Sequence, residues 1–233
     1  MSDNQSMAIP NHIGFIMDGN RRWAKEHGLS TFEGHQKGYK KVRTVLDWCI
    51  NRGINVVTVF AFSTENWNRA KNEVSYLMEL MYWAIKHELH ELQKQKVKVN
   101  FLGRLEGLPS KLQNAMSELV DKTKNNSRAV LNIAINYGGR AEIIDAVKKI
   151  VADNPKPANI KESDFHKYLY ADSVPDPDLI IRTSGEKRLS GFLLWEAAYA
   201  ELFFTKKKWP EFSELDLDEA VNDFGQRKRN FGA

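Results

Sequence analysis

The order of apolar and amphipathic segments is the feature that most limits what this chain can fold into. Several of its apolar runs are nearly continuous rather than alternating, which is typical of strands that are covered on both faces. Amphipathic stretches of helical length separate these runs. Strands that alternate with helices predict a mainly parallel sheet with right-handed crossovers. The predicted strands cover residues 12–17, 54–62, 97–102, 129–137, 178–183 and, more briefly, 192–195.

The domain organisation follows from the same pattern. A chain of 233 residues can form one large domain with a sizeable core. No internal repeat is visible, and the linker-like stretch 152–164 is too short to establish a domain boundary. We therefore expect a flexible segment over 1–10 and one α/β domain over 11–233, with helices flanking the sheet. The predicted helices lie at about 36–52, 73–95, 109–126, 139–153, 162–170 and 216–229.

Composition narrows the class of protein. A single cysteine, Cys49, excludes an intrachain disulfide and fits a reducing compartment. It lies among apolar residues of a predicted helix, which favours a buried filler over a nucleophile. The first ten residues lack the apolar core of a signal peptide, and no apolar run approaches the roughly 18 residues of a membrane span. These features predict a cytoplasmic protein.

The charge balance favours anionic partners without choosing among them. The formal net charge is +4 and the pI is about 9.0, values compatible with nucleic acid, phosphates or a membrane surface. The one dense basic cluster, residues 225–230, is better explained as a solvated tail. An RNA-binding protein is an alternative, but no aromatic-rich recognition motif is present, so we expect no nucleic-acid partner.

A polar cluster at residues 18–22 follows the first predicted strand. Its sequence, Asp-Gly-Asn-Arg-Arg, places one carboxylate and two guanidiniums where a strand ends and a helix begins. Helix N-termini attract anions, and arginine grips phosphate oxygens in pairs. Asp18 fits such a site if Mg²⁺ lies between it and the phosphate. The alternative is a plain Asp-Gly turn with Asp18 as a helix cap.

Three further polar clusters follow other predicted strands, at residues 63–69, 136–140 and 182–190. Ligands of open α/β sheets bind at the carboxyl ends of the strands, so we expect the four clusters to converge there. The cationic charge is more than one phosphate needs and suggests two diphosphates. The guanidiniums expected at this edge belong to Arg22, Arg69, Arg140, Arg182 and Arg188.

Two other features have competing interpretations. The helix predicted over 73–95 has an unusually wide apolar stripe with Met78 and Met81, which fits either an ordinary core face or the wall of a site for a flexible apolar ligand. His35, near a helix start, is as compatible with a structural role as with a functional one. Glycine-rich nucleotide-binding loops are absent from the sequence.

These residues resemble a known family, the bacterial-type undecaprenyl diphosphate synthases, which are cis-prenyltransferases. The resemblance spans most of residues 11–232 and keeps the family's order of motifs. The matching blocks are HIGFIMDGNRRWA, GHQKGYKKV, FAFSTENWNRAKNEV, LNIAINYGGRAEI, DLIIRTSGEKRLSGFLLWEAAYAELFF and WPEF.

The resemblance implies roles for individual residues. Asp18 matches the catalytic aspartate, which also binds Mg²⁺, Asn66 matches the proposed proton acceptor, and Glu201 matches a second metal-linked carboxylate. Residues implied in binding the allylic diphosphate are Gly19, Asn20, Arg21, Arg22 and Trp23, with Thr31 and His35 nearby. Those implied around the reaction centre are Ser63, Thr64, Glu65, Trp67 and Arg69. Those implied in binding isopentenyl diphosphate are Arg182, Arg188, Leu189 and Ser190.

The resemblance also implies an activity and partners. A member of this family adds isopentenyl diphosphate to an allylic diphosphate, such as farnesyl diphosphate, and its long cis-polyprenyl product is a precursor of the lipid carrier for cell-wall polysaccharides. It would need Mg²⁺, an apolar tunnel between sheet and helices, and a second copy of itself, and could touch the membrane when product leaves. A shorter-chain synthase or a non-catalytic partner subunit are the alternatives, although Asp18, Asn20 and Arg22 are intact. The chain departs from the family pattern at Thr31, Ala70, Gly191 and Asn230.

Overall fold

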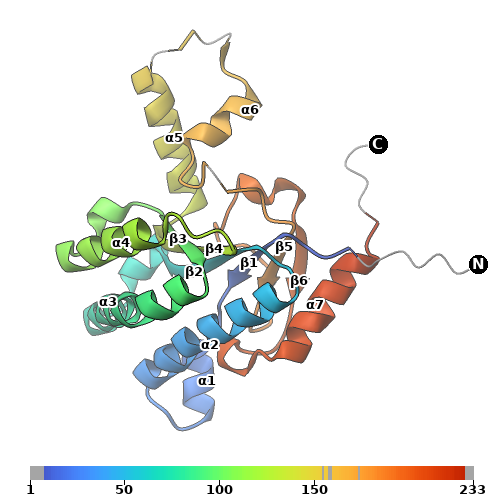
Figure 1. The fold of residues 1–233 in the computed structure, drawn as a ribbon. Helices are drawn as coiled ribbons and strands as arrows, with labels where there is room; N and C mark the ends of the chain where they lie inside the picture. The colour runs from blue at the N-terminus through green and yellow to red at the C-terminus, as the bar shows by residue number, and fades with distance from the viewer. Residues whose placement is uncertain (1–7, 154, 157–158, 173, 229–233) are drawn as a thin grey trace, which may run out of the picture.

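The fold is described from a computed structural model that covers residues 8–153, 155–156, 159–172 and 174–228 (Figure 1). One six-stranded sheet forms its centre, with the strand order β3-β4-β2-β1-β5-β6. Every pairing of neighbouring strands is parallel, which confirms the predicted α/β architecture. The strands are β1 (His12–Ile16), β2 (Val56–Ser63), β3 (Val97–Leu102), β4 (Ala129–Tyr137), β5 (Leu179–Arg182) and β6 (Glu201–Phe204).

The prediction of a strand over 192–195 was wrong. These residues form a turn that precedes a short 3-10 helix, and the edge strand β6 lies further along the chain. Leu193 in this segment has a positive φ of 46°, and the two residues Ser190 and Gly191 just before it have φ of 52° and 81°. Such backbone cannot continue a strand. Phe192 and Leu193 are apolar because they are buried against the sheet rather than part of it.

Helices connect the strands, and their starts follow capping signals in the sequence. The Ser30 hydroxyl accepts from the Glu33 amide and the Glu33 side chain accepts from the Ser30 amide, so the second helix begins five residues earlier than predicted. Ser213 caps the last helix in the same way. The α-helices are α1 (Asn20–Glu26), α2 (Thr31–Asn51), α3 (Lys71–Lys94), α4 (Ser110–Thr123), α5 (Gly139–Asp153), α6 (Glu162–Phe165) and α7 (Glu214–Gln226).

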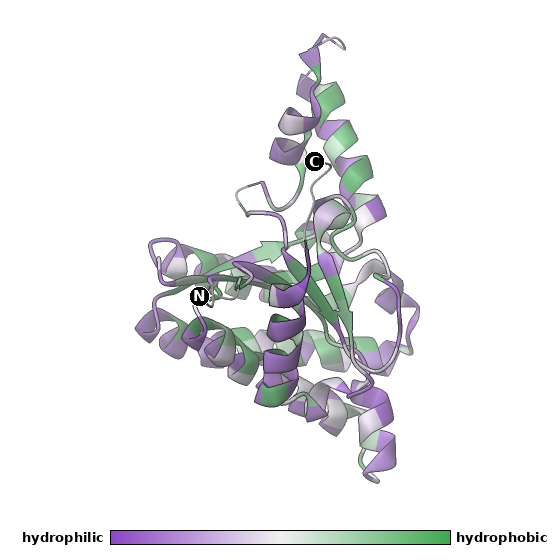
Figure 2. Cartoon of the chain, turned by 90° about the vertical axis from the view of Figure 1, so that its right-hand side faces the viewer, coloured by the Kyte–Doolittle hydropathy of each residue, from purple (hydrophilic) through white to green (hydrophobic). Residues whose placement is uncertain are grey.

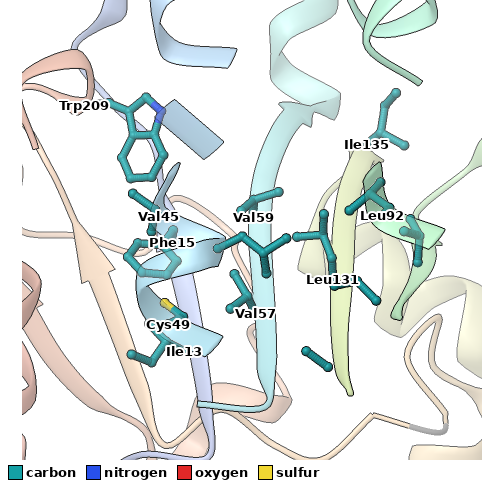
Figure 3. Close-up of a cluster of buried hydrophobic side chains, with 14 of the residues drawn as sticks. Ile13, Phe15, Val45, Cys49, Val57, Val59, Leu92, Leu131, Ile135 and Trp209 are labelled. Atoms are coloured by element: carbon teal, nitrogen blue, oxygen red, sulfur yellow. The ribbon is translucent and has the colours of Figure 1, made fainter. Parts of the chain in front are cut away.

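The two faces of the sheet are covered differently. Helices α2, α3 and α7 lie on one face, where they bury Val45, Cys49 and Phe224 against strand residues such as Phe15 and Val59 (Figures 1 and 3). Cys49 is fully buried, as its position predicted. The other face is covered by residues between α6 and β6, including Ala171, Val174, Phe192 and Leu193. None of the helices in the described part of the chain is long and apolar enough to cross a membrane.

Two segments stand apart from these layers. Helix α5 starts at the carboxyl end of β4 and extends away from the body of the molecule, with α6 beside it (Figures 1 and 2). At the N-terminus, residues 1–10 were predicted to be flexible, and most of them lie outside the described residues. Of the last three of these residues, Ala8 packs against the core and Pro10 is buried.

Candidate active site

The carboxyl ends of the strands surround a polar cavity of about 850 Å³. Because all six strands are parallel, the loops after β1, β2, β3, β4 and β5 open on the same edge. All four clusters that the sequence placed at this edge contribute to the cavity. The predicted site residues that line it are Asp18, Asn20, His35, Ser63, Thr64, Glu65, Asn66, Arg69, Arg182 and Ser190, and Arg140 joins them.

Asp18 lies two residues after β1 and has its carboxylate about one third exposed. Its Oδ1 accepts from the Gly19 amide at 2.7 Å, and its Oδ2 accepts from Arg182 Nη2 at 3.0 Å. The Arg22 guanidinium is 3.6 Å away. Gly19 has φ of 99°, a conformation that favours glycine and lets the chain turn sharply into α1. The carboxylate is therefore held in place while keeping lone pairs for another ligand.

Arg182 connects the loops after β1 and β5. Only 4% of this residue is exposed, yet its guanidinium has three partners. Besides Asp18, it donates to the Arg188 carbonyl at 2.5 Å and to Ser190 Oγ at 2.8 Å. Its Nε has no hydrogen-bond partner among the described residues. A buried cation with these contacts fixes the shape of the 188–190 loop around Asp18.

Residues 63–69 form a short 3-10 turn between β2 and α3. The Asn66 side-chain oxygen accepts from the Ser63 amide at 3.2 Å, which folds the turn back on the end of the strand. Thr64 Oγ1 donates to Glu65. Asn66 thus lines the cavity, and its Oδ1 keeps a second lone pair besides the one that accepts from the Ser63 amide.

Glu73, in the first turn of α3, holds two arginines and a histidine together and was missed in the sequence. Its carboxylate contacts Arg69 at 3.0 Å, His35 Nε2 at 3.2 Å and Arg21 at 3.7 Å. Burial lowers the pKa of His35 despite the opposing effect of Glu73. The pKa of Glu73 is lowered because its bond to His35 and the charges of Arg69 and Arg21 outweigh its burial. An acidic residue at a helix start resembles ordinary capping, so no local signal marked it.

Arg104 also lines the polar cavity and was missed. It follows β3 at the carboxyl edge, so the rule that located the other clusters would have found it. Its Nε and Nη2 donate to Asp145 at 2.7 and 2.9 Å. Its carbonyl accepts from the Asn136 side chain, whose oxygen in turn accepts from Trp67 Nε1 at 2.7 Å.

Several predicted residues lie around the cavity rather than in its wall. Arg22 and Arg188 both pair with Glu186. Trp23 stacks on His27, with ring centroids 4.4 Å apart. The predicted site residues that do not line the polar cavity are Gly19, Arg21, Arg22, Trp23, Thr31, Trp67, Arg188, Leu189 and Glu201.

Glu201 lies at the opposite end of the sheet from Asp18. It begins β6 in register with Leu179 and Ile13, whereas Asp18 comes two residues after Ile16 at the carboxyl end. Asp18 is five residues further along than Ile13, which corresponds to about 16 Å of strand. Glu201 is paired instead with Arg227. The expected joint metal site of Asp18 and Glu201 is therefore not formed within one chain.

An apolar cavity of about 180 Å³ adjoins the polar one. It lies between the sheet and helices α2 and α3, and its walls include Val59, Ala61, Leu77, Met81 and Ile85. Figure 3 shows Val59, Leu92, Leu131 and Ile135 on this face of the sheet. The stripe on α3 is thus partly core and partly cavity wall. The residues common to both cavities are Met17, Asn20, His35, Phe60, Ala61 and Leu77.

The chain is similar to known proteins over nearly its whole length. The family described as putative undecaprenyl diphosphate synthase matches residues 16–232. An isoprenyl transferase of Fusobacterium nucleatum is 51% identical over 96% of both chains. A geranylgeranyl-diphosphate-specific tritrans,polycis-undecaprenyl-diphosphate synthase of Methanopyrus kandleri is 47% identical over 96% of this chain and 85% of its own.

Two solved structures of prenyl diphosphate synthases have the same fold as this chain. Lavandulyl diphosphate synthase from Lavandula x intermedia, in complex with dimethylallyl diphosphate, has a TM-score of 0.93 at 36% identity, covering 97% of this chain and 99% of its own. A probable undecaprenyl diphosphate synthase from Campylobacter jejuni has a TM-score of 0.83 at 30% identity, covering 97% and 100%. The chain belongs to the undecaprenyl diphosphate synthase family of isoprenyl transferases.

Proposed function

We propose that this protein condenses isopentenyl diphosphate units onto an allylic diphosphate, farnesyl diphosphate by preference, to form a long-chain cis-polyprenyl diphosphate such as undecaprenyl diphosphate. The observation that carries this proposal is the contact between the two cavities. A polar cavity with Asp18 and four guanidiniums opens directly onto an apolar cavity behind Ala61 and Phe60. A substrate with a diphosphate head and a hydrocarbon tail fits both.

Asp18 suits the role of Mg²⁺ anchor. Mg²⁺ is usually held by one or two carboxylates together with substrate phosphates. The described residues contain no cluster of three or more potential metal-binding side chains, which fits a cation shared between Asp18 and the substrate. When bound, Mg²⁺ would neutralise charge on the departing diphosphate. Arg182 keeps the Asp18 carboxylate oriented towards the cavity.

The other residues have roles that follow from their positions. Arg69 and Arg182 stabilise negative charge as the allylic carbon–oxygen bond breaks. The double bond of isopentenyl diphosphate then attacks the allylic carbon, and a proton is lost, with Asn66 as the proposed acceptor at the cavity wall. The apolar residues behind Ala61 exclude water from the cationic carbon.

Chain length and primer are the finer part of the proposal. The apolar cavity of about 180 Å³ is smaller than the roughly 300–1,000 Å³ of pockets for drug-sized ligands, so a long chain requires α2 and α3 to move apart. A shorter-chain cis-prenyl diphosphate synthase is the second candidate that this volume favours. The relatives named for geranylgeranyl and lavandulyl diphosphate show that primer and product vary among similar proteins.

We also propose that the protein is a homodimer that uses α5. Ile144, Val147 and Val151 lie on one face of this projecting helix and are 53%, 43% and 71% exposed. Such a stripe on a projecting helix is typical of a protein interface. The substitution Val151→Asp should shift the molecular mass measured by light scattering from two chains to one. An unchanged dimer mass would remove α5 from the interface.

The test of activity is direct. Purified protein, Mg²⁺ and labelled isopentenyl diphosphate are incubated with farnesyl, geranylgeranyl or dimethylallyl diphosphate, and the products are sized by chromatography. We expect a ladder of long products with farnesyl diphosphate and none after chelation of Mg²⁺. No extension of any primer would refute the proposed function. Flotation with lipid vesicles separately tests the predicted peripheral membrane contact.

A further inference from the structure

The guanidiniums of the polar cavity are divided between its two ends. Arg182 lies beside Asp18, at the carboxyl ends of β5 and β1. Arg104 and Arg140 follow β3 and β4, at the other side of β2. At the strand spacing of about 4.8 Å, β3 and β1 are about 14 Å apart. The Arg104–Arg140 end thus lies away from the allylic end beside Asp18, whereas the Gly139 amide donates to the Gly191 carbonyl at 2.7 Å and so brings the start of α5 next to the loop that carries Ser190.

Arg104 is held rigidly with donors to spare. Asp145 engages two of the five guanidinium N–H groups and Tyr170 also bonds to this side chain, so at most two N–H groups remain available. Asp145 also accepts from the Tyr170 hydroxyl at 2.5 Å, and these donors keep the pKa of its carboxyl well below the usual range. The backbone of Arg104 is fixed at both its amide and its carbonyl by Asn136. A preorganised arginine loses little freedom when it binds an anion.

Arg140 adds a positive charge to this end of the cavity, whereas the charge of Arg104 is balanced by Asp145. It is exposed and forms no ion pair with any described residue. It lies in the first turn of α5, a helix of 15 residues, which adds a favourable dipole for an anion. The Arg140 and Ala141 residues both line the cavity at this point.

We propose that Arg104 and Arg140 form a second anion subsite, which takes the inorganic diphosphate released in each condensation. The identity of this ligand rests on the proposed function. Breaking the allylic carbon–oxygen bond leaves the electron pair on the diphosphate, while the new carbon–carbon bond leaves the extended product attached to the other diphosphate. The released anion moves across the cavity to Arg104 and Arg140, which clears the allylic end for the next cycle.

Binding of inorganic diphosphate, measured by calorimetry with chelator and without substrates, tests the subsite independently of turnover. The variants are Arg140→Gln and Arg104→Gln/Arg140→Gln, with Arg128→Gln as the control. Arg128 is exposed and lies at the amino end of β4, away from both cavities. We expect the double variant to weaken binding about tenfold or more, as for lost hydrogen bonds to a charged group, and Arg128→Gln to have no effect.

Arg140→Gln keeps the test valid if the double variant fails to fold, because an exposed, unpaired side chain contributes little to stability. A third variant, Arg182→Lys, should retain this binding. Unchanged diphosphate affinity in the Arg140 and double variants overturns the subsite. The subsite is also overturned if Arg182→Lys loses as much diphosphate affinity as the double variant. A parallel rise in KM for both substrates in the Arg140 variant overturns it as well. Intact Arg140-dependent binding without any prenyl transfer would refute only the proposed function.

Discussion

The polar and the apolar cavity share a boundary at Phe60 and Ala61 but are built from different parts of the chain. Loops after five strands supply the polar cavity, and several charges there have a counter-charge, such as Asp145 for Arg104. The apolar cavity is made from the inner faces of α2, α3 and the sheet. Reactive groups thus reside on short loops that the sheet holds in place, whereas the hydrocarbon region depends on how two helices pack.

This difference predicts that single changes in the polar cavity affect rate, and single changes in the apolar cavity affect product. The largest effect is expected for Asp18→Ala. Loss of this carboxylate should reduce turnover by on the order of a hundredfold or more, the scale of removing one key electrostatic group. The measurement is single-turnover transfer of labelled isopentenyl diphosphate at saturating Mg²⁺. Near-normal turnover would remove Asp18 from the mechanism.

A smaller loss is expected for Glu73→Gln. The amide keeps the shape of Glu73 but removes the charge that holds Arg69 in the polar cavity, beside His35 at the boundary of the two cavities. We expect kcat/KM to fall about tenfold, as for one charge-assisted contact. Glu79→Gln, an exposed residue on the same helix, is the matched control. Equal activities of the two variants would show that the Glu73 cluster is only structural.

In the apolar cavity, Ala61→Leu should change the product more than the rate. The larger side chain fills space at the boundary, so the main product should shorten while stability changes by less than about 3 kcal/mol. Product sizing by chromatography is the measurement, and Ala198→Leu, at an exposed position, is the control. An unchanged product distribution would refute the role of this cavity in chain length.

The smallest effect concerns pH. Burial lowers the pKa of His35 below its ordinary value of 6.5, so the unfolded chain takes up a proton first as pH falls. The free energy of unfolding should therefore decrease below about pH 6.5, and less steeply in His35→Gln. Urea unfolding of both proteins at about pH 7.5 and 5.5 measures the difference. Parallel pH dependence would place His35 in solvent rather than between the cavities.

Much of this architecture was predictable from local pattern. The strands β1 to β5 lie within two residues of their predicted ends because their apolar runs are long and bounded by polar loops. The short edge strand β6 has partly exposed residues and no such contrast, so the buried turn at 192–195 was taken for a strand instead. Similarly, Asp18 and Arg182 were predicted to meet because parallel strands share a carboxyl edge.

The sequence by itself determined the α/β fold, the polar edge and the family, since periodicity and motif order are properties of the chain alone. Only the tertiary structure placed Glu201 at the far end of the sheet, joined Glu73 to His35, and brought Arg104 into the cavity with Arg140. Those relations depend on strand order and on side-chain distances between segments far apart in sequence. No local pattern encodes such distances, because they arise when separate elements pack together.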